Sequence, residues 1–178
     1  MAYYDLEHQA KIEQLRQLWG RLDDIEALAA AYRITDIAQD NNLKLLQTLV
    51  LFDFQNQPGR EGADAIDRYG HAWELKTVNV NLTRAFSTNH HTNHERIEAF
   101  RQERWLFSVY KGILLQEVYA VSPRDLEDAY FSKWWEKSER AHINNPKIPL
   151  AFVKSVGVCV YPFDPENPKD PAEILKEL

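Results

Sequence analysis

The sequence predicts an α/β fold in which helices flank a central, twisted, mixed β-sheet. Near the N-terminus, apolar residues recur every three or four positions, which is typical of an amphipathic helix. Residues 71–80 instead alternate in the manner of a strand, and further strand and helix patterns follow them. Helices followed by a strand meander and then by mixed elements indicate one sheet covered by helices.

The composition is that of a folded protein with a single core, at 44% hydrophobic and 27% charged residues in a chain of 178. We expect one domain over residues 1–161, followed by a proline-rich and acidic tail, 162–178. The apolar runs are too short for a membrane span, and no signal peptide is apparent. A cytoplasmic location is therefore expected. The single cysteine, Cys159, fits a reducing compartment and is expected to be buried.

The net charge of −6 is unfavourable for nucleic-acid binding, because phosphate contacts need local positive potential. Charge interactions are screened over ~10 Å, however, so the positions of the charges matter more than their sum. A short basic stretch surrounds Asn144-Asn145 and can supply that potential. It comprises Lys137, Arg140, Lys147 and Lys154.

Two helices are predicted in the N-terminal part of the chain. The first runs from Leu6 to about Ala31, with one apolar stripe. Thr35 or Asp36 is expected to cap the second, which ends near Phe52. The apolar stripe of the first helix would either cover a core or pair with a second copy of the chain, and the residue pattern favours neither.

A β-hairpin is predicted next, with strands over residues 63–67 and 71–80. In its second strand, Glu74 and Lys76 lie on the same face because side chains alternate with a period of two. Asp64, on the first strand, can meet them across the hairpin. The remaining expected elements are a loop over 81–93, a helix over 94–102, paired strands over 105–110 and 116–121, a helix over 123–140, a loop at 144–146 and a strand over 156–161.

Asp64, Glu74 and Lys76 are candidate catalytic residues. Two carboxylates and an ammonium group can hold Mg²⁺ and position a water against a phosphodiester. Asp64 and Glu74 would bind the metal, with the Leu75 carbonyl as a further ligand, and Lys76 would orient or deprotonate the water. Alternating charges on a strand more often form its solvated face. The carboxylate on the neighbouring strand favours a functional site instead.

The polar segment from Ser87 to His94 is a second candidate site. Histidine and asparagine side chains can read base edges in the major groove of DNA, and Asn144-Asn145 offers a similar element. Two other interpretations remain open. His90 and His94 are four residues apart and could share a helical face that binds zinc, or the segment could be a solvated loop.

Over about residues 15–161 the chain contains a series of short, specific sequence motifs. In chain order they are Asp36-Ile37, Gln39–Asn41, Lys44–Gln47, Pro58–Gly62, Glu74–Lys76, Phe86–Thr88, His90-His91 and Ile143–Pro149. These motifs closely resemble the PvuII family of type II restriction endonucleases. The resemblance implies a restriction-endonuclease-like fold of the PD-(D/E)xK class and a homodimer that binds double-stranded DNA in a cleft. It also implies Mg²⁺-dependent double-strand cleavage of palindromic DNA at CAG/CTG, with blunt ends and 5′-phosphates.

The resemblance also assigns roles to residues and regions. The helical region at about 6–31 would serve dimerisation, and a protecting DNA methyltransferase is expected in the host, although not as a bound subunit. The catalytic positions are Asp64, Glu74 and Lys76; Asp40 falls at the DNA minor groove; Ser87, His90, His91, Asn144 and Asn145 fall on base-reading positions, and Thr88 on a neighbouring one.

The chain departs from the family pattern at two informative positions. Asn89 replaces the first of three consecutive histidines, and Phe100 replaces a tyrosine near the scissile phosphate, which removes a hydroxyl group. We expect a changed rate or metal response rather than lost activity. Two alternative functions remain: a structure- or repair-directed PD-(D/E)xK nuclease, or a catalytically impaired DNA-binding relative. The intact acidic pair with Lys76 argues against the latter.

Overall fold

The computed structural model describes residues 6–57, 62–88, 92–162 and 171–174 of the chain. The chain forms two compact units, Met1–Gln47 and Thr48–Leu178. Within the residues that are described, no helix has both the length and the apolar character that crossing a bilayer requires.

The first unit contains the predicted N-terminal helix, α1 (Leu6–Ala31). Its end is closed by a hydrogen bond from the Ile34 backbone N–H to the Ala29 carbonyl at 3.0 Å. Ala29 is buried, whereas Leu18 and Leu28 are 53% and 46% exposed. Part of the apolar stripe of α1 therefore faces solvent in the single chain.

Helix α2 (Asn42–Phe52) begins later than predicted. The prediction that Thr35 or Asp36 caps this helix is wrong, because the Asp36 carboxylate accepts a hydrogen bond from the Ala38 backbone N–H at 2.9 Å. Such local bonding stabilises a turn in competition with a helix. In the first turn of α2, the backbone N–H groups of Lys44 and Leu45 instead donate to the Asn41 carbonyl, each at 2.9 Å.

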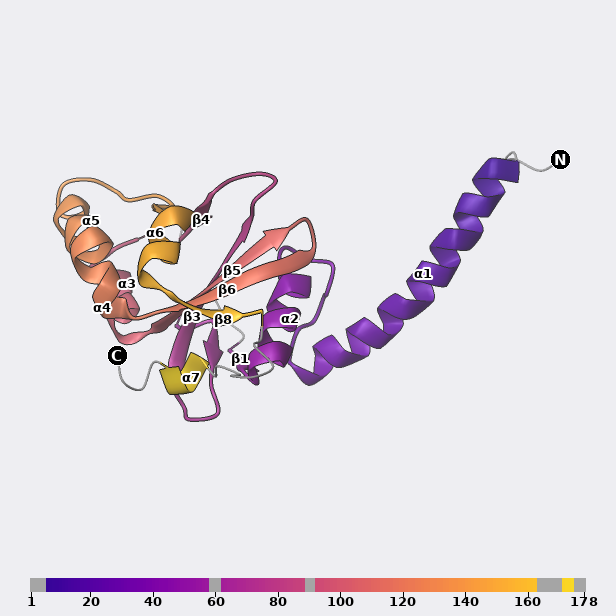
Figure 1. The fold of residues 1–178 in the computed structure, drawn as a ribbon, viewed down its shortest axis with the longest axis horizontal. Helices are drawn as coiled ribbons and strands as arrows, with labels where there is room; N and C mark the ends of the chain where they lie inside the picture. The colour runs from indigo at the N-terminus through magenta and orange to yellow at the C-terminus, as the bar shows by residue number, and fades with distance from the viewer. Residues whose placement is uncertain (1–5, 58–61, 89–91, 163–170, 175–178) are drawn as a thin grey trace. The chain divides into compact units, whose positions relative to one another are not determined.

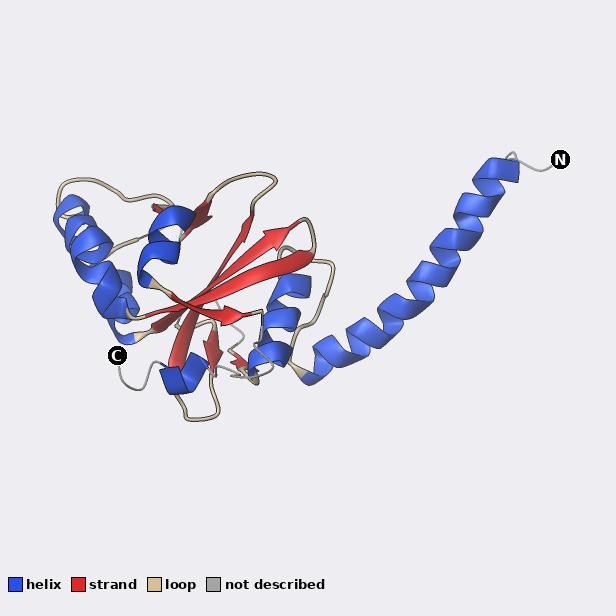
Figure 2. Ribbon diagram, in the orientation of Figure 1, coloured by secondary structure: helices blue, strands red, loops and turns tan. Residues whose placement is uncertain are grey.

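The second unit is built on a mixed sheet, which confirms the predicted α/β class with a central mixed sheet (Figures 1 and 2). The strands of this sheet are β1 (Gln55–Asn56), β2 (Ala65–Ile66), β3 (Ala72–Asn79), β5 (Arg104–Lys111), β6 (Leu114–Val121) and β8 (Val158–Tyr161), in the spatial order β1-β2-β3-β5-β6-β8. Strands β3 and β5 are parallel, and the other neighbours are antiparallel.

The turn between β2 and β3 follows the predicted hairpin, although β2 is shorter than expected. Gly70 has a φ of 86°, a conformation that glycine adopts without steric cost, and its N–H donates to the Asp67 carbonyl at 3.0 Å. The buried Asp67 carboxylate accepts a hydrogen bond from Trp73 Nε1 at 2.9 Å. The turn therefore fixes the register that aligns the two strands.

Helices gather at the end of the sheet where β5 begins (Figure 1). The described helical segments of the second unit, after α2, are α3 (His94–Gln102), α4 (Pro123–Leu126), the π-helical turn η1 (Glu127–Phe131), α5 (Ser132–Ser138), α6 (Leu150–Val156) and α7 (Pro171–Ile174). Helix α3 matches its prediction. The single helix predicted over 123–140 is instead three consecutive segments, and α6 was not predicted.

A second, two-stranded sheet was also missed. Strands β4 (Ala85–Ser87) and β7 (Lys147–Pro149) are antiparallel, with Phe86 opposite Ile148. Both of these side chains are fully buried. Each strand has three residues, too few to show the alternation that identifies a strand in sequence.

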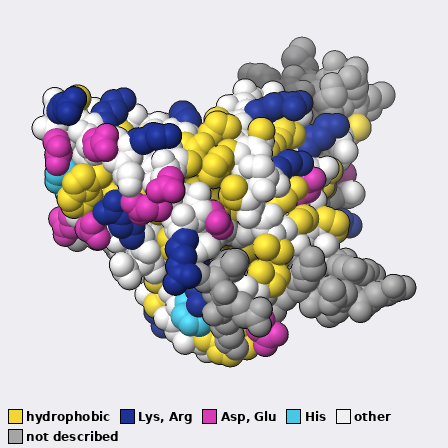
Figure 3. All heavy atoms as spheres, turned by 60° about the vertical axis from the view of Figure 1, so that its left-hand side comes forward, with side chains coloured by type: hydrophobic (Ala, Val, Ile, Leu, Met, Phe, Trp, Pro, Cys, Tyr) yellow, Lys and Arg dark blue, Asp and Glu magenta, His cyan; other side chains and the backbone are white. Residues whose placement is uncertain are grey.

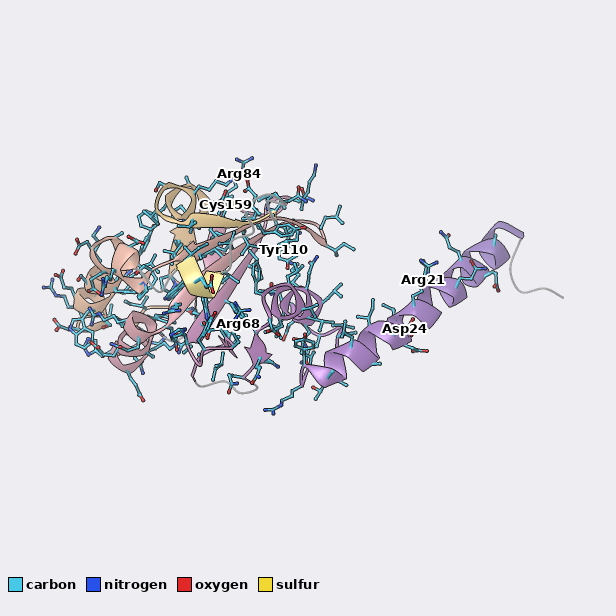
Figure 4. All side chains as sticks on the ribbon, turned by 60° about the horizontal axis from the view of Figure 1, so that its bottom comes forward. Arg21, Asp24, Arg68, Arg84, Tyr110 and Cys159 are labelled. Carbon is cyan, nitrogen blue, oxygen red and sulfur yellow. The ribbon has the colours of Figure 1, made fainter. Side chains whose placement is uncertain are left out.

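The expectation that Cys159 is buried is wrong, because its side chain is exposed on β8 (Figure 4). Alternation along this edge strand turns the neighbouring Val160 inward, where it is 2% exposed, and Cys159 outward. On β5, burial raises the pKa of Tyr110 to about 12, and this side chain forms a hydrogen bond with Thr48 of α2.

Candidate active site

The β2–β3 hairpin brings together the three predicted catalytic residues. Asp64 directly precedes β2, and its backbone N–H donates to the Trp73 carbonyl at 3.0 Å. Its Oδ2 accepts a hydrogen bond from the Leu75 N–H at 2.8 Å. Lys76 Nζ lies 3.9 Å from the same oxygen and also contacts Glu74 Oε1. One ammonium group is thus shared by two carboxylates on adjacent segments.

These charges do not form a solvated strand face. Glu74 is fully buried, and the side chain of Lys76 is 11% exposed. Asp64 is more open, with 43% of its side chain exposed. Desolvation by the surrounding protein and the nearby Glu74 charge raise the pKa of Asp64, while Lys76 acts against this rise. Solvent at the open side of Asp64 limits the effect.

Arg96 and Glu103 extend the cluster, and the sequence pattern indicated neither of them. Arg96 Nη2 donates to Glu74 Oε2 at 2.5 Å, and Arg96 Nη1 lies 3.0 Å from Glu103 Oε1. The Arg96 guanidinium also lies over the Phe100 ring, 4.3 Å from its centroid. A sequence signal exists for Arg96, since it lies four residues before the buried Phe100 and so shares a face of α3 with it.

Glu103 follows α3 directly and is 4% exposed. Burial raises the pKa of the Glu103 carboxyl, and the Arg96 guanidinium opposes this rise. The cluster therefore contains three carboxylates, those of Asp64, Glu74 and Glu103, compensated by Lys76 and Arg96.

The carboxylates of Asp64 and Glu74 fit a magnesium ion. The buried Glu74 Oε1 contacts the Lys76 ammonium group, and the partly exposed Asp64 carboxylate lies 3.9 Å from the same ammonium group. Across the described part of the chain, no group of three or more His, Cys, Asp or Glu side chains could hold a metal. Mg²⁺ commonly takes one or two carboxylates and retains several waters, so the pair is a sufficient donor set.

The β4–β7 pair places two predicted DNA-contacting segments side by side. Ser87, the last residue of β4, lies opposite Lys147, which donates to its hydroxyl group. The Thr88 backbone N–H and hydroxyl group both donate to the Pro146 carbonyl, at 3.2 and 2.9 Å. Ser87 and Thr88 are therefore tied to the loop that carries Asn144 and Asn145.

The two asparagines differ in their surroundings. Asn144 is exposed, whereas Asn145 is partly buried and has a φ of 49°, in the left-handed region. Asn145 Oδ1 is buried and has no hydrogen-bond partner among the described residues. Buried amide oxygens without a partner are uncommon in folded proteins.

The other predicted recognition residues are Asp40, His90 and His91. His90, His91 and the substituted Asn89 are outside the described residues. Asp40 is in the first unit, exposed in the turn before α2 with a φ of 47°. His94 is one of the two histidines in the alternative zinc interpretation. Its Nε2 lies 3.3 Å from the Trp135 carbonyl, and the His94 and Trp135 rings stack with centroids 4.0 Å apart, so this side chain already has partners within the protein.

The predicted basic stretch supplies less free charge than its composition indicates. Lys154 Nζ lies 2.5 Å from Glu117 Oε2, so a carboxylate offsets its charge. Lys137, Arg140 and Lys147 are exposed. On the face drawn in Figure 3, lysine and arginine side chains are interspersed with acidic ones.

Comparison with known protein families shows the class of this chain: it matches the restriction endonucleases, which act on DNA. The matching family is described as restriction endonuclease PvuII, and its sequence model covers residues 10–161. Because that range is most of the chain, the chain belongs to this family.

Proposed function

We propose that the chain is a Mg²⁺-dependent type II site-specific endonuclease that makes double-strand breaks in palindromic DNA. The observation that carries this proposal is the convergence of Asp64, buried Glu74 and Lys76 on one hairpin of a restriction endonuclease family member. Burying such charges is costly, so a cluster of this kind is more typical of a functional site than of a structural one.

In the proposed site, Asp64 and Glu74 hold Mg²⁺, with the Leu75 carbonyl as a further ligand. When bound, the cation lowers the pKa of a water and offsets the negative charge that develops on the phosphate. Lys76 orients the attacking water or accepts its proton, and adds positive charge beside the phosphate. The hydrogen bond from the Leu75 N–H holds the Asp64 carboxylate in place.

DNA sequence would be read mainly by the loops at the β4–β7 pair. We propose base contacts from Ser87, His90, His91, Asn144 and Asn145, with Thr88 beside them and Asp40 at the minor groove. Asn145 supports this assignment, because its side-chain oxygen is buried and unsatisfied. The proposed target is the palindrome with half-sites CAG/CTG, cut to blunt ends that carry 5′-phosphates.

We also propose that the enzyme is a homodimer joined through the region of α1, with the DNA in a cleft. Leu18 and Leu28 are about half exposed in the single chain, which supports a partner for this helix. A two-fold dimer matches the symmetry of a palindromic site and places one active site on each strand. A host methyltransferase that protects the same sequence completes the proposal.

Phe100 lies beside Arg96 of the proposed site, at the position where the family pattern has a tyrosine. Its ring is fully buried against the Arg96 guanidinium and has no hydroxyl group to offer a phosphate. We therefore expect a changed cleavage rate or metal response, rather than loss of cleavage.

The proposal is tested by incubating plasmid DNA with the purified chain and Mg²⁺ and sequencing the product ends. We expect discrete fragments with blunt, 5′-phosphorylated ends at one palindrome. Ends scattered over many sequences would instead indicate a structure- or repair-directed nuclease. Specific binding without cleavage would indicate a catalytically impaired relative.

A further inference from the structure

Arg96 lies between two buried carboxylates, of which one belongs to the proposed metal site. Its guanidinium group donates to Glu74 Oε2 at 2.5 Å, to Glu103 Oε1 at 3.0 Å and to the Gly62 carbonyl at 3.2 Å. The Arg96 side chain is 14% exposed, and those of Glu74 and Glu103 are 1% and 6% exposed. Charges this well shielded from water interact strongly.

Two buried atoms of this bridge, Arg96 Nε and Glu103 Oε2, have no hydrogen-bond partner within the part of the chain that the structure describes. Unsatisfied buried polar atoms are costly, and a carboxylate and a guanidinium group prefer to pair through two parallel hydrogen bonds. Glu103 Oε2 can therefore accept a second hydrogen bond from Arg96, and Arg96 Nε can donate it.

Glu74 does not need Arg96 for charge balance alone. Lys76 already contacts its other oxygen, Oε1. Arg96 thus adds a second positive charge to the carboxylate that is the most buried ligand of the proposed metal site. A divalent cation at Glu74 would be repelled by that charge at short range.

We propose that Arg96 is a positioning residue that bridges Glu74 and Glu103 while the metal site is empty, and that it releases Glu74 and pairs with Glu103 alone when a divalent cation binds. This inference rests on the proposed function and extends it to metal affinity. The Phe100 ring lies under the guanidinium group and would stabilise it by a cation–π contact during the shift. Glu103 is then the carboxylate that receives Arg96, rather than a metal ligand.

The proposal predicts that substitutions at the two ends of the bridge change metal affinity in opposite directions. Arg96→Met removes the competing charge, so Mn²⁺ should bind ~10-fold more tightly, the scale of effect known for residues behind metal ligands. Glu103→Gln removes the charge that receives Arg96, so Mn²⁺ should bind ~10-fold more weakly. Arg96→Lys retains the competing charge, so it should not show the gain in affinity of Arg96→Met.

A double variant provides the matched control. Arg96→Met leaves Glu103 buried without a partner and can destabilise the chain, whereas Arg96→Met with Glu103→Gln removes both charges together. In the Arg96→Met background, Glu103→Gln should have little further effect on Mn²⁺ affinity, because Glu103 acts through Arg96. Melting temperatures without metal separate changes in stability from changes in affinity.

The test is a titration of the full chain with Mn²⁺ in the absence of DNA, in which electron paramagnetic resonance reports the free ion. Opposite shifts in Mn²⁺ affinity for Arg96→Met and Glu103→Gln, with no gain for Arg96→Lys, would support the inference. Shifts in the same direction, or none, would overturn it while leaving the proposed nuclease function intact. A wild-type chain that binds no Mn²⁺ would overturn both the inference and the proposed metal site.

Discussion

At the scale of single residues, Asp67 stabilises the hairpin that carries the candidate site. One carboxylate oxygen accepts hydrogen bonds from the backbone N–H groups of Tyr69 and His71, each at 2.9 Å. The other accepts from Trp73 Nε1 at 2.9 Å. Burial acts to raise the pKa of Asp67, but these hydrogen bonds outweigh it and lower the pKa below its usual value.

Replacing Asp67 by asparagine should lower the free energy of unfolding by about 1–3 kcal/mol at pH 7. Because the pKa of Asp67 is lowered in the folded chain, its stabilising effect is complete above about pH 4 and is lost as the pH falls through the folded value. The difference in free energy of unfolding between wild type and Asp67→Asn should therefore be smaller in acid. Urea unfolding of both proteins at pH 7 and below pH 4 measures this difference.

The exposed Asp53 provides a control for this experiment, since Asp53→Asn should leave stability nearly unchanged at both pH values. A gap between wild type and Asp67→Asn that stays constant with pH would contradict the assigned role of Asp67.

At the scale of elements, the β4–β7 pair holds the loop before β7 against the end of β4. Asn145, in this loop, combines a left-handed backbone with an unsatisfied side-chain oxygen. Asparagine tolerates this conformation better than most residues with a Cβ atom. The residue can therefore serve the loop conformation, base recognition or both.

Two substitutions of Asn145 separate these roles. Asn145→Gly keeps the left-handed backbone but removes the amide, so discrimination between the target and a one-base variant should fall by ~1–3 kcal/mol while the melting temperature changes little. Asn145→Ala should lose the same discrimination and also about 1 kcal/mol of stability. Binding assays on both duplexes, with Ca²⁺ in place of Mg²⁺, and thermal unfolding provide the measurements. Full discrimination by Asn145→Gly would show that the amide reads no base.

Element length decided which parts of the fold could be predicted from sequence. Helices α1 and α3 span enough turns to show their periodicity, and their predicted bounds are confirmed. Strands β4 and β7 are too short to show it, and α6 occupies a stretch for which no helix was predicted, ending at the residue where a strand was expected to start. In the candidate site, the hairpin pattern located Asp64, Glu74 and Lys76. Arg96 and Glu103 were missed because buried charges look like surface charges in a sequence.

At the scale of the whole molecule, the proposed dimer should depend on the apolar positions of α1. Changing Leu18 and Leu28 together to lysine places charges on that stripe. We expect this variant to sediment as a monomer and to lose double-strand cleavage. Leu82→Lys, at an 83% exposed leucine in the second unit, should remain a dimer. A double variant that still sediments as a dimer would place the interface elsewhere.

If Asp64, Glu74 and Lys76 form the proposed catalytic centre, Lys76→Ala removes the group that activates the attacking water. Wild type and variant are compared on one duplex containing the target palindrome, with cleavage measured in Mg²⁺ and binding in Ca²⁺. Lys111→Ala, at an exposed lysine at the end of β5, is the control. We predict that Lys76→Ala abolishes cleavage while binding persists, and that Lys111→Ala retains both. Cleavage by Lys76→Ala at the wild-type rate, or loss of its binding together with cleavage, would contradict the assignment.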